Sequence, residues 1–201
     1  MTAYAAEKLR IAEDLVATLA PHCERIDITG ALRRQAPRPK DIDIVCEPRG
    51  ERRYQTSMFT GNAELVLETP AFDEALRLWQ TTRKLNRTKH GPRFVQLQPE
   101  DHSYSIDVFI VRPPAQYGAV LAIRTGPAGF SQLCVTSRVD GGAMPISMRQ
   151  HEGKLWRLGE WVETPTEESW FGALGIPYWE PEERTEERLR QWLAERRRQR
   201  G

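Results

Sequence analysis

Three short segments in which polar and apolar residues alternate constrain the fold of this chain most strongly. They are residues 25–29, 41–46 and 105–111. Successive side chains of a β-strand point to opposite faces, so each segment predicts a strand with one apolar and one polar face. Such strands are stable when the apolar face is covered, and this predicts a sheet with helices packed against it.

The remaining segments supply those helices and further strands. Apolar residues at helical spacing predict helices over residues 5–19, 70–79, 116–124 and 127–137. Further strands are expected over residues 64–68 and 93–97, and a hairpin over 144–163 that turns at Glu152-Gly153. Another helix is expected to use Thr164 as its cap, with Pro165 in its first turn and Glu167 completing a capping box, and to end at Gly175.

Length and charge limit the classes of function. The 201 residues suit one or two domains, and Pro113-Pro114 marks a boundary that divides the chain into 1–112, 113–185 and a charged tail over 186–201. The tail is expected to be a solvated or frayed helix. With 29 basic and 28 acidic residues the net charge is +1, so binding of a polyanion requires a local basic patch. We expect a cytoplasmic protein without a membrane span, because no apolar run or leader pattern is evident. The three cysteines are odd in number and far apart in the sequence, which predicts free thiols.

Carboxylates on the predicted strands form a candidate metal site. Asp41 and Asp43 share one strand face, and Asp107 lies on the polar face of another strand. If these strands are neighbours, three like charges meet and require divalent cations to neutralise them. Oxygen ligands without histidine or thiolate favour Mg²⁺ or Mn²⁺ over zinc. The alternative is that these are solvent-facing strand acids.

A glycine and two arginines precede this acidic pair. Gly30-Ala31-Leu32-Arg33-Arg34 directly follows the first predicted strand. A glycine at a strand-to-helix turn lets backbone N–H groups approach phosphate oxygens, and an arginine adds a forked donor. Alone this motif is weak evidence for a phosphate site, but its spacing to the three aspartates makes it specific.

The arrangement resembles the family X DNA polymerases of the nucleotidyltransferase superfamily. The resemblance rests on Gly30–Arg34 followed by Asp41-Ile42-Asp43, on Asp107 within residues 105–109, and on residues 116–126, 167–175 and 181–184. It covers roughly residues 5–185 and implies an α+β fold: a palm with a mixed sheet and flanking helices, and a small thumb-like subdomain. The family's N-terminal lyase domain is not recognisable, so a minimal form is expected.

The resemblance implies two-metal transfer of dNMP from a dNTP to a primer 3′-hydroxyl, in DNA repair or in the filling of gaps and ends. Asp41, Asp43 and Asp107 would bind two Mg²⁺ ions, for which Mn²⁺ can substitute, and Asp107 would accept the hydroxyl proton. The nucleotide-binding residues would be Gly30, Ala31, Arg34, Lys40, Ile123, Arg124, Thr125, Gly126 and Phe130.

Two details follow from the residues at this nucleotide-binding turn. Ile123-Arg124 replaces the family's Tyr-Phe next to the sugar, which predicts that rNTPs are accepted within about a hundredfold of dNTPs. A proline follows Gly126, which predicts a cis Gly126–Pro127 peptide.

A basic run without acids covers residues 77–93 and predicts a DNA contact. Its members Arg83, Lys84, Arg87, Lys89 and Arg93 would follow the phosphates of a primer–template or a DNA end. The alternative is a solvated helix face and loop. We expect a monomer that does not bind membranes, with a repair protein as a possible partner.

Two other classes of function remain open from the sequence. One is a nucleotidyltransferase with a small-molecule, RNA or protein acceptor, and the other is a non-catalytic DNA-end-binding module. The thumb-like segment 116–181 favours a polymerase, and the presence of all three acids argues against a non-catalytic module.

Overall fold

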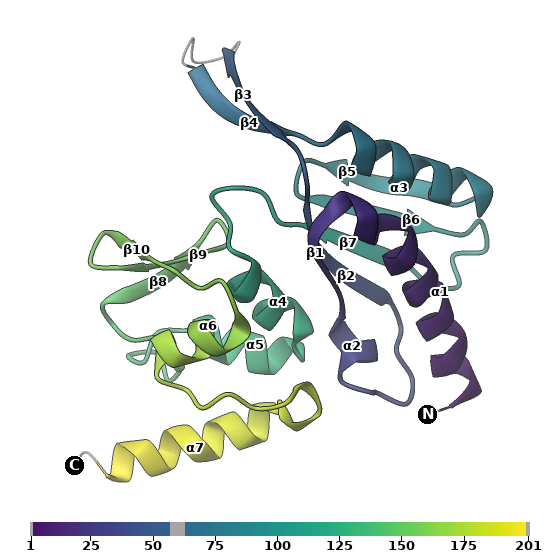
Figure 1. Cartoon of the computed structure of the whole chain (residues 1–201). Coiled ribbons are helices and arrows are strands. Elements are labelled where there is room, and N and C mark those ends of the chain that lie inside the picture. The colour runs from purple at the N-terminus through teal and green to yellow at the C-terminus, as the bar shows by residue number, and fades with distance from the viewer. Residues whose placement is uncertain (1, 57–62, 200–201) are drawn as a thin grey trace.

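A mixed five-stranded sheet forms the centre of the first half of the chain (Figure 1). The computed structural model describes residues 2–56 and 63–199. The strand order is β1 (Cys23–Thr29), β2 (Ile42–Pro48), β7 (Ile106–Ile110), β6 (Phe94–Gln98) and β5 (Asn86–Gly91). β2 and β7 are parallel, and the other neighbours are antiparallel. The predicted α+β class with a mixed sheet and flanking helices is therefore confirmed.

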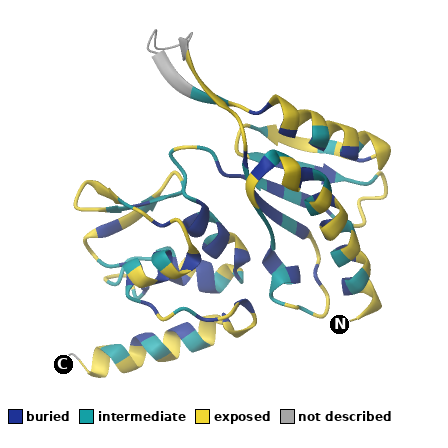
Figure 2. Ribbon diagram, in the orientation of Figure 1, coloured by how far each residue is buried: buried dark blue, intermediate teal, exposed yellow. Residues whose placement is uncertain are grey.

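Two helices cover the apolar face of this sheet, α1 (Ala3–Leu19) and α3 (Pro70–Thr82). A 3₁₀ turn over Ala20–His22 joins α1 to β1, and the single-turn helix α2 (Gly30–Arg33) follows β1. The first hydrophobic core lies between these helices and the strands, where the sheet and the inner helix faces are buried (Figure 2). Its members include Leu15, Leu19, Phe72, Leu76, Ile42, Ile44, Ile106 and Val108. Burial of this face leaves the acidic residues of β2 and β7 on the opposite face.

The second half of the chain has its own hydrophobic core. Its helices are α4 (Tyr117–Thr125), α5 (Ala128–Val135), α6 (Glu167–Leu174) and α7 (Glu186–Arg198), with a 3₁₀ turn over Pro181–Glu183. A three-stranded antiparallel sheet adds β8 (Met148–His151), β9 (Lys154–Arg157) and β10 (Glu160–Val162). α4 joins the two halves, because Ala119 and Ala122 pack in the second core while Tyr117 and Leu121 pack on Val45 of β2.

Three strands were not predicted from the sequence: β3 (Glu51–Thr56), β5 and β10, since the expected hairpin over 144–163 has only two strands. β3 pairs with β4 (Ala63–Glu68) in a hairpin that extends away from the main sheet (Figure 1). β5 is an edge strand whose residues are mostly exposed, so it lacks the apolar alternation that identifies a half-buried strand. The expected turn at Glu152-Gly153 is present between β8 and β9.

Two predictions about the C-terminal part were wrong. α6 is capped by Thr166 rather than Thr164, and Ser169 rather than Glu167 completes the capping box. Thr164 is buried, and its backbone N–H and hydroxyl both donate to Gln116 Oε1 instead. The charged tail forms the expected helix, α7, but this helix is not solvated on all sides, because Leu189 packs in the second core.

None of the helices in the described part of the chain has both the length and the apolar character needed to cross a membrane. Cys23, Cys46 and Cys134 are free and buried.

Candidate active site

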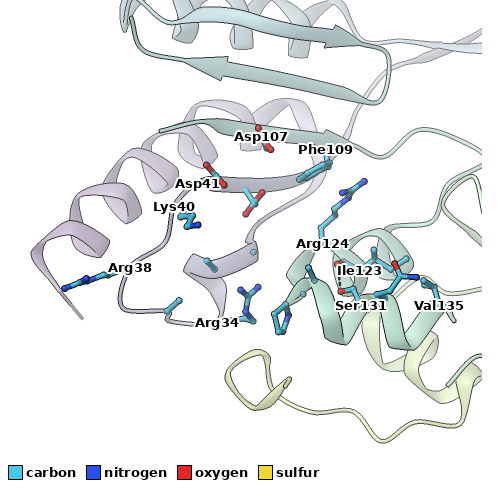
Figure 3. Close-up of a pocket in the computed structure, with 18 residues that line it drawn as sticks. Arg34, Arg38, Lys40, Asp41, Asp107, Phe109, Ile123, Arg124, Ser131 and Val135 are labelled. Atoms are coloured by element: carbon cyan, nitrogen blue, oxygen red, sulfur yellow. Dashed lines mark hydrogen bonds between the residues drawn. The ribbon is translucent and has the colours of Figure 1, made fainter. Parts of the chain in front are cut away.

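Parallel pairing of β2 and β7 brings the predicted carboxylates together. Asp43 lies opposite Asp107 in the register of these two strands, and Asp41 directly precedes β2. All three aspartates line one cavity of about 750 Å³ between the main sheet and helices α4 and α5 (Figure 3). The structure therefore gathers three acids that are separated by up to 66 positions in the sequence, from 41 to 107.

The electrostatics of the cavity disfavour this gathering of negative charge. Burial raises the pKa of Asp43 to about 6, and the charges of Asp107 and Asp41 add to the effect. Burial also raises the pKa of Asp107, although a hydrogen bond from Gln96 opposes the shift. A cation placed among these groups would relieve both the burial and the repulsion.

The donor set fits a hard divalent cation, although the carboxylates do not yet converge on one point. Asp41 Oδ1 accepts a hydrogen bond from Ser105 Oγ at 3.0 Å, and Asp107 Oδ1 accepts one from Gln96 Nε2 at 2.8 Å. Within residues 2–56 and 63–199, no three His, Cys, Asp or Glu side chains form a ready-made metal site. The cavity lining contains carboxylates and neither histidine nor cysteine, which suits Mg²⁺ or Mn²⁺.

Gly30 occupies the closest approach between the backbone and these carboxylates. Its φ is +62°, and a Cβ at this position would overlap the carboxylate of Asp43. Glycine is therefore required both for the left-handed backbone and for the contact. Ala31 also lines the cavity, so the turn predicted for phosphate binding lies beside the acids.

Two arginines face the acids across the cavity (Figure 3). Arg34 Nη1 donates to the backbone carbonyl of Thr125, and burial lowers the pKa of Arg34 while the charge of Asp43 opposes this shift. The guanidinium of Arg124 lies over the Phe109 ring, with Cζ 4.1 Å from the ring centroid. Burial lowers the pKa of Arg124 as well, against the charges of Asp43 and Asp107.

The loop side of the cavity carries further cations. Lys40 lines it as predicted, and Arg38 lines it although the sequence analysis did not single it out (Figure 3). Together with Arg34 and Arg124, these side chains give the cavity four basic groups and three acidic ones. Such a lining suits a ligand that carries several phosphate charges together with metal ions.

The turn between α4 and α5 forms another wall. Ile123 and Gly126 line the cavity, and the Gly126–Pro127 peptide is cis, which confirms that prediction. Thr125 does not reach the cavity, because it is buried and its Oγ1 forms hydrogen bonds with Thr29 and Arg33.

Phe130 was expected to contact the nucleotide, but it lies in the second core. Its ring packs against Phe171 and Trp179, with centroid separations of 6.1 Å in both cases. Helical geometry explains the difference, because the face of α5 that lines the cavity is formed by residues spaced three and four apart. These cavity-lining residues are Ala128, Ser131, Gln132 and Val135.

A buried lysine supports the loop that leads to Asp41. Lys8 Nζ donates to the carbonyl of Pro39 at 3.0 Å and to the carbonyl of Lys40. Only 3% of Lys8 is exposed, and its ammonium lies over the rings of Tyr4 and Tyr104. The sequence carried a signal for this role, since Lys8 interrupts the otherwise apolar face of α1.

A buried ion-pair network connects the turn at residues 30–34 to the second half of the chain. Arg33 Nη2 and Arg184 Nη1 contact the two carboxylate oxygens of Glu167 at 2.6 and 2.7 Å. Burial raises the pKa of Glu167, but the hydrogen bonds from both arginines outweigh it and hold that pKa below its usual value. Sequence reasoning assigned Glu167 to a helix cap and missed this network.

The predicted DNA-binding cations are dispersed rather than gathered at the cavity. Arg83 forms an ion pair with Asp14, and Arg87 Nε donates to Gln80. Lys84 is exposed at the end of α3, and Arg93 lines two smaller cavities. Lys89 is the member whose charge acts on a catalytic candidate, because it lowers the pKa of Asp107 against the effect of burial.

No protein-family model matches the chain, and a search of curated proteins finds no match. The assignment of a function therefore depends on the geometry and chemistry of the site.

Proposed function

We propose that this chain is a nucleotidyltransferase similar to the family X DNA polymerases, and that it adds dNMP to the 3′-hydroxyl of DNA. One observation carries the proposal: Asp43 and Asp107 lie opposite each other on neighbouring strands, with Asp41 beside them, in a cavity that also contains Arg34 and Arg124. Acids that can hold cations and arginines that can hold phosphates are the two groups that phosphoryl transfer requires.

Divalent cations belong to this proposal. Asp41, Asp43 and Asp107 would hold two Mg²⁺ ions, or Mn²⁺ in their place, after the carboxylates of Asp41 and Asp107 turn from their present partners. When bound, these ions stabilise the attacking and leaving oxygens of an in-line displacement.

Each residue of the cavity then has a role that its position supports. Asp107 would accept the proton of the 3′-hydroxyl at its carboxylate once that carboxylate has turned from the amide of Gln96. Arg34 would donate to oxygens of the β- and γ-phosphates, which leave as pyrophosphate when the 3′-hydroxyl displaces them from the α-phosphate, and the backbone at Gly30 would approach them closely. Ile123 and the turn at Gly126 would border the sugar.

The acceptor and setting are also part of the proposal. The exposed Lys84, together with Lys89 near Asp107, supports a DNA strand that enters over β5 and β6. We propose a monomer of the cytoplasm that fills gaps or extends ends in DNA repair, with rNTPs accepted beside dNTPs.

Primer extension tests the proposal. Wild type should add each dNTP to at least one of blunt, single-stranded, recessed and gapped DNA in the presence of Mg²⁺ or Mn²⁺. Asp43→Ala and Asp107→Ala should each reduce the rate by about 1,000-fold or more, because loss of a metal ligand removes several kcal/mol of charge stabilisation. Asp101→Ala, a control at an exposed carboxylate outside the cavity, should act like wild type.

Two results would contradict the proposal in different ways. Near-normal rates in both cavity variants would remove the catalytic assignment. Transfer of a labelled nucleotide to a small acceptor, without extension of any DNA, would retain the chemistry and replace the acceptor.

A further inference from the structure

The outer face of the three-stranded sheet displays aromatic and basic side chains in one row. The pairing register places Arg149 of β8 beside Trp156 of β9, and Trp156 beside Trp161 of β10. The next row along the same strands, Gln150, Leu155 and Val162, points to the other face, where Leu155 and Val162 pack in the second core. The two tryptophans therefore face away from that core.

Cations lie over both indole rings. Lys154 Nζ is 4.6 Å from the Trp161 ring centroid and 5.4 Å from that of Trp156, and Arg149 Cζ is 5.8 Å from the Trp156 ring. Trp161 is 48% exposed. Among the ion pairs formed by described residues, none includes Arg149 or Lys154, so their charges are available to an anionic ligand. We call Arg149, Lys154, Trp156 and Trp161 the Trp–Lys face.

The turn between β8 and β9 connects the Trp–Lys face to the surroundings of the candidate active site. A cavity of about 240 Å³ is lined by Glu152 and Gly153, which form the turn between β8 and β9. The same cavity is lined by Phe109, Ile123 and Arg124, which also line the larger cavity with the three aspartates. Lys154 directly follows Gly153, so a strand leaving the larger cavity past Arg124 would reach the Trp–Lys face.

We propose that the Trp–Lys face binds single-stranded DNA, namely the overhanging strand of the DNA substrate. The identification of that strand rests on the proposed function, whereas the binding itself does not. Flat aromatic rings accept stacked bases of any sequence, and neighbouring cations pair with the phosphates between them. The flexible side chain of Lys154 can move from the rings to a phosphate while a base takes its place.

Binding of labelled oligo(dT), measured by fluorescence anisotropy without divalent cations or nucleotides, tests the proposal independently of catalysis. Trp161→Ala should weaken binding about tenfold or more, and Trp161→Phe should retain most of it because a ring remains for stacking. Trp161→Leu should resemble Trp161→Ala, since it is apolar but cannot stack. Tyr54→Ala is the control, because Tyr54 is an exposed aromatic residue on the β3–β4 hairpin.

Lys154→Gln provides a second measurement that does not alter an aromatic side chain. It should reduce the slope of log affinity against log salt by about 0.7, the value for one phosphate contact on a single strand. Absence of oligo(dT) binding in wild type, or equal affinities in wild type, Trp161→Ala and Lys154→Gln, would overturn the proposal. Equal oligo(dT) affinities of Trp161→Leu and Trp161→Phe would also overturn the proposal. That result would mean that apolar contact rather than base stacking matters at this position, as on a surface that binds a protein partner.

Primer extension separates this proposal from the proposed function. Asp43→Ala should abolish transfer but retain oligo(dT) binding, whereas Trp161→Ala should raise the KM for recessed DNA with a long overhang. Binding that depends on Trp161 without any transfer would contradict the proposed function alone. Nucleotide transfer by a chain whose oligo(dT) affinity is unchanged in Trp161→Ala would contradict only the proposal for the Trp–Lys face.

Discussion

Replacement of Asp43 by asparagine should stabilise the metal-free chain at neutral pH. Asp43 is partly buried and its pKa is raised to about 6, chiefly by burial and then by the charges of Asp107 and Asp41. Ionisation of Asp43 is therefore less favourable in the folded chain than in the unfolded chain. An asparagine side chain at this position removes the charge at nearly the same volume, so the repulsion disappears without a cavity in the core.

The magnitude follows from the difference between the two pKa values. The ordinary value is 3.8 and the folded value is about 6, which at 1.36 kcal/mol per pKa unit corresponds to about 3 kcal/mol. Asp43 is only partly enclosed, and solvent screens part of the repulsion, so we expect about 1–3 kcal/mol. For a chain of this size, each kcal/mol raises Tm by about 2–4 °C.

The pH dependence has a definite sign. Between pH 4 and 6 the folded chain holds a proton on Asp43 that the unfolded chain has released, so the contribution of Asp43 to wild-type stability falls as pH rises through this window. The stabilising effect of Asp43→Asn should therefore be small at pH 4, grow up to pH 6 and stay constant above it. Thermal unfolding of wild type and variant in EDTA from pH 4 to 8 measures this difference.

Asp101→Asn is the matched control, because Asp101 is exposed and hydrogen bonds from Ser103 lower its pKa. Its effect should have the opposite sign or be absent. Equal Tm values for wild type and Asp43→Asn at pH 7, or a difference that does not change with pH, would refute the electrostatic reasoning. Addition of Mg²⁺ should then stabilise wild type more than Asp43→Asn.

Three further substitutions test the supports of the site. Gly30→Ala should lower transfer to background, because its Cβ would overlap the carboxylate of Asp43. Gly159→Ala, at a similarly left-handed backbone with open space around it, should retain activity. Lys8→Met should reduce kcat in primer extension about 10- to 100-fold through displacement of the loop before the first aspartate, and Lys8→Arg should restore part of it. Glu167→Gln leaves the buried Arg184 without its counter-charge, so it should lower the free energy of unfolding in denaturant by about 3 kcal/mol or more. An unchanged free energy of unfolding would show that these ion pairs do not stabilise the fold.

The central part of the site was predictable because its elements are periodic. Asp41, Asp43 and Asp107 belong to segments that alternate in polarity, and alternation fixes which side chains share a face. Their pairing as parallel neighbours was not predicted, because neither segment contains it and the family resemblance implied only that the three acids hold the same metal ions. The turn at Gly30 was predictable for a different reason. Few residues other than glycine tolerate a positive φ next to another side chain, so a glycine directly after a strand indicates such a turn.

Elements without a periodic signal were missed. β5 consists of polar residues on an exposed edge, and its stability comes from pairing with β6 rather than from its own burial. Phe130 was misplaced because a motif aligned along the sequence does not specify which face of α5 meets the cavity. The Arg33–Glu167 pair joins residues 134 positions apart, so no local pattern could indicate it.

Arg124 shows how tertiary structure adds to the interpretation of a residue that the sequence analysis singled out. Its position next to Thr125-Gly126 suggested a contact with the nucleotide sugar. In the folded chain its guanidinium lies over Phe109, which β7 supplies, and its charge lowers the pKa of Asp43 against the effect of burial. A divalent cation among the aspartates would act on the same carboxylates, and two positive charges that neutralise one group repel each other. Arg124 therefore stabilises the acidic cavity in the absence of a cation, and a bound cation would weaken the interaction between Arg124 and Asp43.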